Sequence, residues 1–347
     1  MRALRDPHFY GLIRKYLTVY LPKQKCVSPN TIRAYQNALE SILDYIVEHK
    51  NMKLSEISFE TITASLVYDF LEWLVTCKGC SISTRNHRLQ CIRSFYGYVA
   101  DTDPSAAVFA NEIFKVQSMP NTASHQIDYM SEPAIAAILS EPDRATARGI
   151  RDVVLMTLLY DTGARIQEIL NLRLSDVCLH ESRITLLGKG QKIRSVTLMN
   201  STKEHLLNYL SVYHPGSPPD RPLFYTTRNG LRRSMTSDNA RKLIKAYGTL
   251  ARRNCVEVPE NVHPHMFRHS RAMHLYQHGM PLLLVSQWLG HANVETTLIY
   301  AHADTEMKRK AIEASTPETS PLKSFSNSER FTISDEDLIK KLYGIRK

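Results

Sequence analysis

Four short segments of this sequence, far apart along the chain, carry side chains that can bind and attack a phosphate group. They are TGARIQEIL, GKGQKIR, HPHMFRHS and WLGHANVETTLIY. Arginine suits a phosphate because a guanidinium stays protonated and donates to two oxygens at once. Tyrosine is a poor nucleophile at neutral pH, since its pKa is about 10, but nearby cations favour the phenolate. The candidate catalytic residues are Arg165, Lys189, His265, Arg268, His291 and Tyr300.

The order and the local contexts of these segments resemble the tyrosine recombinase (phage integrase-like) family, in the style of Xer recombinases and integrases of mobile elements. The family's catalytic set is Arg, Lys, His-x-x-Arg, His or Trp, and Tyr, and every position of that set is filled here. Each motif alone is common, so the specific signal is their conjunction in this order. The resemblance covers the catalytic half strongly and the N-terminal segments SPNTIRAY and STRNHRLQCIRSFY more loosely.

The resemblance implies a mechanism for breaking and rejoining DNA. Tyr300 attacks a phosphodiester, which leaves a 3′-phosphotyrosyl bond and a free 5′-hydroxyl. Arg165 and Arg268 neutralise the charge that builds on the non-bridging oxygens. Lys189 is the expected general acid for the leaving 5′-oxygen; His265 assists proton transfer and His291 donates to the phosphate. The covalent bond keeps the energy of the broken phosphodiester, so neither ATP nor a metal nor any other cofactor is expected.

Two further residues are assigned supporting roles. Glu168 lies one helical turn after Arg165, where the family has an acidic residue that orients active-site groups. An ion pair within the helix or on its surface is an equal alternative for Glu168. His269 matches a family position beside Arg268 and is interpreted as structural support.

The composition is that of a globular, basic protein. Hydrophobic residues make up 43% of the 347 residues, which excludes a disordered chain. Lys plus Arg (44) exceed Asp plus Glu (34), so the net charge of +10 favours a polyanionic partner such as double-stranded DNA. The N-terminus MRALRDPHFY has no apolar core of a signal peptide, and no apolar run is long enough to span a membrane. The six cysteines are therefore expected to be reduced thiols, and the protein to lie in the bacterial cytosol or nucleoid.

Helical spacing of apolar residues dominates, so we expect a mainly α fold with a small β-sheet (α+β). Ser28-Pro29, the residue Ser81 and Ser131-Glu132-Pro133 begin helices, and Thr162-Gly163 ends one. Alternation on both sides of GKGQK predicts a β-hairpin over residues 182–198. Asp103-Pro104 ends the N-terminal helical unit, and turn formers near Met119 mark a linker.

The predicted domains follow from these elements and from the resemblance. Residues 1–118 form a helical core-binding (SAM-like) domain, residues 119–127 a linker and residues 128–315 the catalytic domain. Residues 316–347 form a flexible tail that ends in an interaction helix. The two domains are expected to close as a C-shaped clamp around duplex DNA.

Several basic residues outside the catalytic set are candidates for binding the DNA backbone. Those near the helix that begins at Ser81 have a solvated helix face as the alternative, and the charge pattern does not choose between the two. Those at the hairpin are expected to touch phosphates rather than to react. The candidates are Arg85, Arg88, Arg93, Lys192 and Arg194.

The last helix, DEDLIKKLYG, follows a stretch rich in Ser, Thr and Pro. In the family such a segment packs into a neighbouring subunit, so we expect a homo-oligomer on DNA, a dimer per site and a tetramer in synapsis, or an assembly with a related recombinase. The alternative is that the helix folds back on its own domain. Its apolar positions are Leu338, Ile339, Leu342 and Tyr343.

The segment CKGC, with His87 and Cys91 close behind, suggests zinc, but structural zinc sites show two clear ligand pairs, so no metal site is predicted.

The main functional hypothesis is integration, excision or transposition of a mobile element. Its rivals are a chromosome-dimer resolvase of the Xer kind, a type IB topoisomerase and a non-catalytic DNA-binding regulator.

Overall fold

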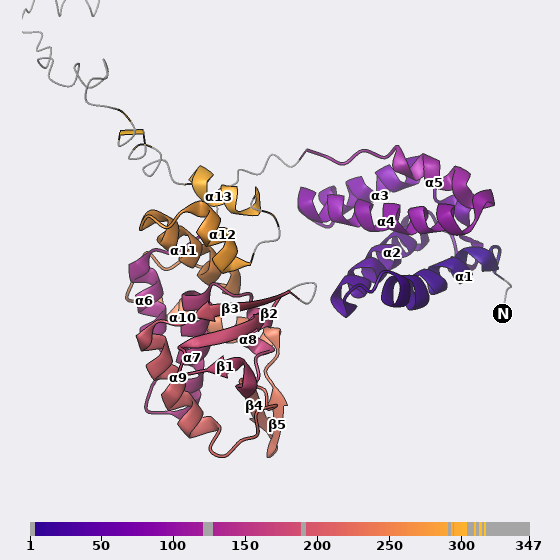
Figure 1. Cartoon of the computed structure of the whole chain (residues 1–347). Coiled ribbons are helices and arrows are strands. Elements are labelled where there is room, and N and C mark those ends of the chain that lie inside the picture. Colours follow the sequence, from indigo (N-terminus) through magenta and orange to yellow (C-terminus); the bar gives the residue numbers. More distant parts are fainter. Residues whose placement is uncertain are drawn as a thin grey trace, which may run out of the picture. The chain divides into compact units, whose positions relative to one another are not determined.

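The protein is represented by a computed structural model that describes residues 4–120, 128–188, 192–290, 293, 295–303, 309, 312–313 and 316. The chain divides into two compact units, Met1–Ser124 and His125–Lys347 (Figure 1). Several predicted site residues lie outside the described residues, and they are Lys189, His291, Leu338, Ile339, Leu342 and Tyr343.

The first unit is entirely helical in its described part. Its shorter segments are the π-helix η1 and three turns of 3₁₀-helix, and its core is a cluster of apolar and aromatic side chains. The elements are α1 (Pro7–Lys15), η1 (Tyr16–Gln24), α2 (Pro29–His49), η2 (Leu54–Glu56), η3 (Phe59–Thr61), α3 (Ala64–Thr76), α4 (Ile82–Thr102), η4 (Pro104–Ala106) and α5 (Ala107–Phe114).

Serine caps begin three helices where the sequence predicts them. Ser28 Oγ accepts from the backbone N–H of Thr31 at 3.2 Å, which caps α2. Ser81 and Ser131 cap α4 and the first helix of the second unit in the same way. A side-chain acceptor satisfies one of the N–H groups that a helix leaves unpaired at its start, so these positions fix where each helix begins.

The first unit continues beyond Asp103, which corrects the prediction that Asp103-Pro104 ends it. Pro104 starts η4, and α5 follows and buries Ala110 and Ile113 in the core of the unit. A helix of this length is not stable on its own, because its stability comes from packing. The local sequence pattern therefore does not predict α5.

The three arginines of α4 that were candidates for DNA binding contact backbone carbonyls within the first unit. Arg85 is only 4% exposed, and its Nη1 donates to the carbonyl of Gln117 at 3.0 Å, so its expected exposure is wrong. Arg93 Nη2 donates to the carbonyls of Phe114 and Val116, which holds the chain after α5 against α4. Arg88 Nη1 lies 3.5 Å from the carbonyl of Ala34 on α2. These arginines stabilise the unit, since buried carbonyls need donors.

The second unit combines helices with two small antiparallel sheets, so the predicted mainly helical fold with a small sheet is confirmed. Its elements are α6 (Glu132–Ser140), α7 (Ala147–Thr162), α8 (Ile166–Leu170), η5 (Leu174–Asp176), β1 (Val177–Cys178), β2 (Arg183–Leu187), β3 (Ile193–Thr197), α9 (Asn200–Tyr213), β4 (Tyr225–Arg228), β5 (Leu231–Ser234), α10 (Ser237–Ala251), α11 (Pro264–Gln277), α12 (Leu282–Leu289) and α13 (Glu295–Ala303).

The predicted hairpin is present as β2 and β3, paired from Arg183 with Thr197 to Leu187 with Ile193. A short strand, β1, extends this sheet in the order β1-β2-β3. The second hairpin, β4–β5, was not predicted. Its turn residues Asn229 and Gly230 have φ values of 51° and 74°, which is typical of a two-residue hairpin turn.

Helix α7 is the centre of the second unit. Its apolar residues are almost completely buried, and it packs against α6, α8, α9 and α11. Figure 1 shows α11, α12 and α13 together at one end of this unit and the β4–β5 hairpin at the other. Among the described residues, no helix is both long and apolar enough to cross a membrane.

Candidate active site

The corner between α7 and α8 positions the first candidate arginine. Gly163 ends α7 in the left-handed region, with φ +58°, and the chain turns sharply there. Arg165 follows as the residue that precedes α8, and 38% of its side chain is exposed. A guanidinium held at such a corner is available to a phosphate, while the packed helix α7 fixes its position.

Glu168 fixes this arginine from the protein interior. Its carboxylate is 5% exposed, and Oε1 accepts from Arg165 Nη1 at 3.0 Å while Oε2 accepts from the Arg165 backbone N–H at 3.0 Å. Oε2 also accepts from Arg194 Nη2 at 2.7 Å. Burial alone would raise the pKa of Glu168, but the donors from Arg194 and Arg165 outweigh it and hold the pKa below its usual value. This geometry fits both the orienting role and an ion pair within the helix, because Glu168 pairs with Arg165 three residues earlier. The burial of Glu168 does not fit an ion pair on the surface.

Arg268 on α11 is anchored to two backbone carbonyls. Nη1 donates to Gly163 at 2.6 Å and Nη2 donates to Leu289 at 2.8 Å, and the residue is 3% exposed. Burial and the nearby charge of Arg165 lower the pKa of Arg268 to about 10, so the guanidinium is still protonated at neutral pH. The two hydrogen bonds tie together the end of α7, α11 and the end of α12.

His265 lies one turn before Arg268 on the same helix, as the His-x-x-Arg spacing predicts. Partial desolvation in the cleft lowers the pKa of His265, and the positive charge of Arg268 lowers it further. The ring is therefore neutral at neutral pH, which is the state that can accept a proton.

Tyr300 on α13 is 1% exposed and contacts His269 rather than solvent. Its hydroxyl is 3.0 Å from His269 Nδ1. Burial raises the pKa of Tyr300 to about 12, although the charge of Arg268 opposes the shift. Burial and the neighbouring His265 and Arg268 lower the pKa of His269 to about 4, so its neutral ring accepts the hydrogen bond from the phenol.

One cleft of about 510 Å³ brings four of the six candidates together, namely Arg165, His265, Arg268 and Tyr300. His269, Thr296 and Ile299 complete its lining. The sequence predicts only a supporting role for His269, and none of its motifs singles out Thr296 or Ile299. The i, i+4 spacing of His265 and His269 was the signal that both face the same side of α11.

This arrangement offers what attack on a phosphodiester requires. Arg165 and Arg268 supply fixed positive charge to oxygens that become more negative, and the cleft holds a phenol beside a neutral imidazole. The charge of Arg268 also favours ionisation of the phenol, against the larger effect of burial on its pKa.

The two hairpin residues predicted to touch DNA differ in their surroundings. Lys192 is exposed. The side chain of Arg194 is only 15% exposed and is paired with Glu168, so the structure places it beside the catalytic cleft as an internal ion pair. A role for Arg194 confined to the DNA backbone does not agree with this position.

The cysteines considered for zinc are free thiols, with Cys77 exposed and Cys80 half-buried. Within the described part of the chain, one group of possible metal ligands lies elsewhere, at the turn between β1 and β2, where ligand atoms of Cys178, His180 and Glu181 lie within 4.8 Å of one another. Glu181 is already paired with Arg183 there.

Comparison with known proteins identifies the family. The profile of the phage integrase family matches residues 128–307, and that of the phage integrase N-terminal SAM-like domain matches residues 13–102. The tyrosine recombinase XerD of Staphylococcus epidermidis is 30% identical over 309 residues, which cover 86% of this chain and 96% of XerD. The integrase/recombinase y4rC of Sinorhizobium fredii is 29% identical over 308 residues, 88% of this chain and 91% of that protein.

Solved structures agree in fold. The integrase of transposon Tn1549, in complex with transposon right end DNA, matches with a TM-score of 0.66 at 17% identity over 87% of this chain and 98% of the other. The XerH site-specific recombinase, bound to a palindromic difH substrate after cleavage, matches with a TM-score of 0.64 at 21% identity over 89% of both chains. The match to the phage integrase profile and the 30% identity to XerD show that the chain belongs to the phage integrase family and is a tyrosine site-specific recombinase.

Proposed function

We propose that this recombinase cleaves and rejoins double-stranded DNA with Tyr300 as the nucleophile, and that the reaction integrates, excises or transposes a mobile element. The observation that carries the proposal is the cleft shared by Arg165, His265, Arg268 and Tyr300. A scissile phosphate in this cleft has two guanidiniums for its non-bridging oxygens and a phenol within the same lining.

The proposed reaction has two steps, cleavage and rejoining of one DNA strand. The Tyr300 oxygen attacks phosphorus and loses its proton to a neutral histidine of the cleft, while Lys189 protonates the leaving 5′-oxygen and His291 donates to the phosphate. In the second step a 5′-hydroxyl attacks the 3′-phosphotyrosine and restores the phenol. The bond energy is conserved in the covalent intermediate, so the cycle consumes no ATP.

Binding of duplex DNA by both units, as a clamp, is part of the proposal. Support comes from the net charge of +10 and from the DNA-bound state of the XerH and Tn1549 integrase structures. Lys192 and the partly exposed Arg88 and Arg93 remain candidates for phosphates. We place this activity in the bacterial cytosol, at the nucleoid.

A nicked suicide substrate tests the chemistry. With a nick just downstream of the cleavage site, the 5′-hydroxyl fragment dissociates and the covalent protein–DNA adduct accumulates. We expect an adduct that resists denaturant and is absent with Tyr300→Phe, whose DNA affinity should match that of the wild type. An adduct of equal yield with Tyr300→Phe contradicts the assignment, and binding without any adduct favours a regulator. Supercoil relaxation without strand exchange favours a type IB topoisomerase.

Resolution of chromosome dimers is the second candidate, because XerD is as similar to this chain as y4rC is. The similarity to the integrase/recombinase y4rC supports the mobile-element role. The two roles predict different substrates. Terminal repeats flanking the gene, recombined by the purified protein, support an element, whereas recombination only between chromosomal dimer-resolution sites supports the Xer role.

We further propose a homo-oligomer in which the tail of one subunit binds its neighbour, as a dimer per site and a tetramer in synapsis. Apolar side chains that such a tail can cover are exposed on α12 and α13, two helices that pack together, and include Leu283, Leu284 and Leu298. Truncation before Asp335 should abolish cooperative DNA binding while a single subunit still binds. Unchanged cooperativity and recombination after truncation would reject the docking of the tail.

A further inference from the structure

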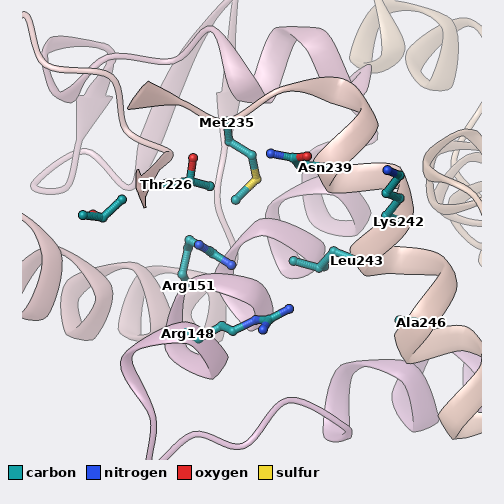
Figure 2. A pocket seen from close by; sticks show the side chains of 9 residues that line it. Arg148, Arg151, Thr226, Met235, Asn239, Lys242, Leu243 and Ala246 are labelled. Carbon is teal, nitrogen blue, oxygen red and sulfur yellow. The ribbon is translucent and has the colours of Figure 1, made fainter. Parts of the chain in front are cut away.

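A basic pocket of about 480 Å³ lies in the second unit, away from the catalytic cleft, with which it shares no lining residue. Its walls come from the first turns of α7, from the β4–β5 hairpin with the residue that follows it, and from one face of α10. Figure 2 shows the side chains of Arg148 and Arg151 extending from α7 towards α10. The lining residues are Arg148, Arg151, Thr226, Thr227, Met235, Asn239, Lys242, Leu243 and Ala246.

The charge of this pocket is positive. Asp152 is completely buried below it and accepts from Arg151 Nε and Nη2 at 2.8 and 2.6 Å and from the Tyr247 hydroxyl at 3.0 Å. Arg148 Nε lies 3.6 Å from the other oxygen of Asp152. One carboxylate is therefore shared by two guanidiniums, and Lys242 forms no ion pair with an acidic residue of the described chain. The carboxylate orients the arginines and leaves an excess of positive charge.

The remaining walls suit a nucleotide. Thr226, Thr227 and Asn239 offer uncharged hydrogen-bonding groups, while Met235 and Leu243 are apolar. A volume of this size is in the range of small-molecule sites, about 300–1,000 Å³, and exceeds what a phosphate alone needs. Guanidinium and ammonium groups bind phosphate, and an apolar wall can contact a sugar or a base.

We propose that this pocket is a second phosphate-binding site, which takes a nucleotide unit with its phosphate on Arg148, Arg151 and Lys242. The nucleotide comes either from the backbone of the bound duplex, away from the cleaved phosphate, or from a free nucleotide in solution. The first source depends on the DNA-binding function proposed above, and the second does not.

The test uses the full-length protein with two charge-matched double variants. Arg148→Gln with Lys242→Gln removes two pocket cations and leaves the Arg151–Asp152 pair intact. Arg144→Gln with Arg253→Gln removes two exposed cations outside the pocket. The probes are dAMP, measured by calorimetry, and a fluorescent duplex, titrated at several salt concentrations. Adduct formation on the suicide substrate is measured in parallel, so loss of the catalytic function is seen separately.

Loss of dAMP binding by ten-fold or more in the pocket variant alone supports a free-nucleotide site. A fall of about 2 in the slope of log affinity against log salt, in the pocket variant alone and without dAMP binding, supports the duplex as the source. If the two double variants behave alike with both probes, the proposal is overturned.

A second inference concerns Arg194, which contacts three segments that carry catalytic residues. Its Nη2 binds Glu168, the carboxylate that holds Arg165. A Cβ at Gly290 would lie 2.9 Å from Arg194 Cδ, and one at Gly188 would lie 3.5 Å from Arg194 Nη1. Gly188 and Gly290 directly precede Lys189 and His291 in the sequence. Arg194 thus packs tightly against Gly290, where a side chain would collide with it, and lies within van der Waals range of Gly188.

The geometry points to Arg194 as a positioning residue that sets Arg165, the end of β2 at Gly188 and the end of α12 at Gly290 relative to one another, and through these glycines the residues Lys189 and His291 that follow them in the sequence. It acts through Glu168 and through close packing against two backbone segments, and needs no contact with the substrate. This role also explains why an arginine is used, because its planar head can pair with a carboxylate while its faces lie against a backbone.

The test measures single-turnover cleavage by Arg194→Met and Arg194→Lys, with Arg183→Lys, on the same hairpin but paired with exposed Glu181, as the control. We expect a fall of 100-fold or more in rate for Arg194→Met, partial activity for Arg194→Lys, and DNA affinity within two-fold of wild type for both. A substrate with a sulfur leaving atom in place of the 5′-oxygen needs no general acid, and it should restore part of the rate if the variant displaces Gly188 and, with it, Lys189. Loss of affinity in step with rate, without this rescue, would instead make Arg194 a plain DNA contact and overturn the inference.

Discussion

The hydroxyl of Tyr300 lies 3.0 Å from Nδ1 of His269, and this hydrogen bond joins α13 to α11 inside the catalytic cleft. The two residues are 31 positions apart in the sequence. Because the phenol is almost completely buried and its pKa is raised to about 12, an acceptor for its proton is required before it can attack.

His269→Ala should therefore lower the rate of DNA cleavage. Removing a positioned proton acceptor typically costs about 10²-fold or more in rate. Single-turnover cleavage of the suicide substrate measures the effect, with DNA affinity as a separate readout. His263→Ala, an exposed histidine just before the same helix, is the matched control and should keep its rate. Equal rates for His269→Ala and wild type would show that another group takes the proton.

The same histidine makes the stability of the protein depend on pH. Burial and nearby positive groups lower the pKa of His269 from 6.5 to about 4. As the pH falls, the unfolded chain takes up this proton before the folded chain does. The stabilisation is thus complete above pH 6.5 and is lost as the pH falls towards 4. Urea unfolding across this window should show a smaller loss for His269→Gln than for wild type; identical losses would contradict a depressed pKa at this site.

Glu168→Gln tests the buried carboxylate that orients two arginines. The amide keeps one acceptor but loses the negative charge that offsets Arg165 and Arg194. Breaking a buried ion pair by removing one partner typically costs about 3–5 kcal/mol of stability. Urea unfolding measures this change, and the cleavage rate should fall with it because Arg165 loses its orientation.

Glu181→Gln is the control for this prediction. Glu181 is an exposed acid paired with Arg183, and exposed pairs contribute about 0–1 kcal/mol. A similar small loss of unfolding free energy in both variants would mean that the Glu168 carboxylate contributes no more to stability than an exposed acid does.

Local chemistry in the sequence predicted the ends of many elements. The serine caps at Ser28, Ser81 and Ser131 form local hydrogen bonds within the next three residues. The β2–β3 hairpin was visible because its strands alternate, and Ile184, Leu186 and Val196 are buried as that alternation requires. These features depend on near neighbours, so a single sequence contains them.

The features that were missed depend on distant contacts. Whether Arg85 faces solvent or the carbonyl of Gln117 is decided by α5, a helix that local pattern did not reveal. Arg194 pairs with Glu168, 26 positions away, and a charge pattern along one strand carries no information about that contact. The β4–β5 hairpin did have a local signal, the Asn229-Gly230 pair, which is a known preference of two-residue turns.

Gly163→Ala should lower both the stability of the protein and the rate of DNA cleavage. Two features of this position disfavour a side chain, namely its backbone conformation and a close neighbouring atom. Its φ of +58° disfavours any side chain, at about 1–2 kcal/mol. A Cβ there would also lie 2.8 Å from Leu289 Cδ2, and the Leu289 side chain is completely buried and has little room to move. The carbonyls of Gly163 and Leu289 both accept from Arg268, so a backbone shift that relieves the clash moves one anchor of that guanidinium.

Gly216→Ala separates the effect of the backbone conformation from the effect of the close neighbouring atom. Gly216 has a similar φ of +63°, but a Cβ there meets nothing within 4 Å. The backbone cost is therefore shared, whereas the clash and the displacement of Arg268 belong to Gly163 alone. We expect Gly216→Ala to lower the urea midpoint slightly and to cleave at the wild-type rate, and Gly163→Ala to lose more stability and at least ten-fold in cleavage rate. Equal stability loss with full activity in both variants would mean that Arg268 does not depend on the carbonyl of Gly163 for its position.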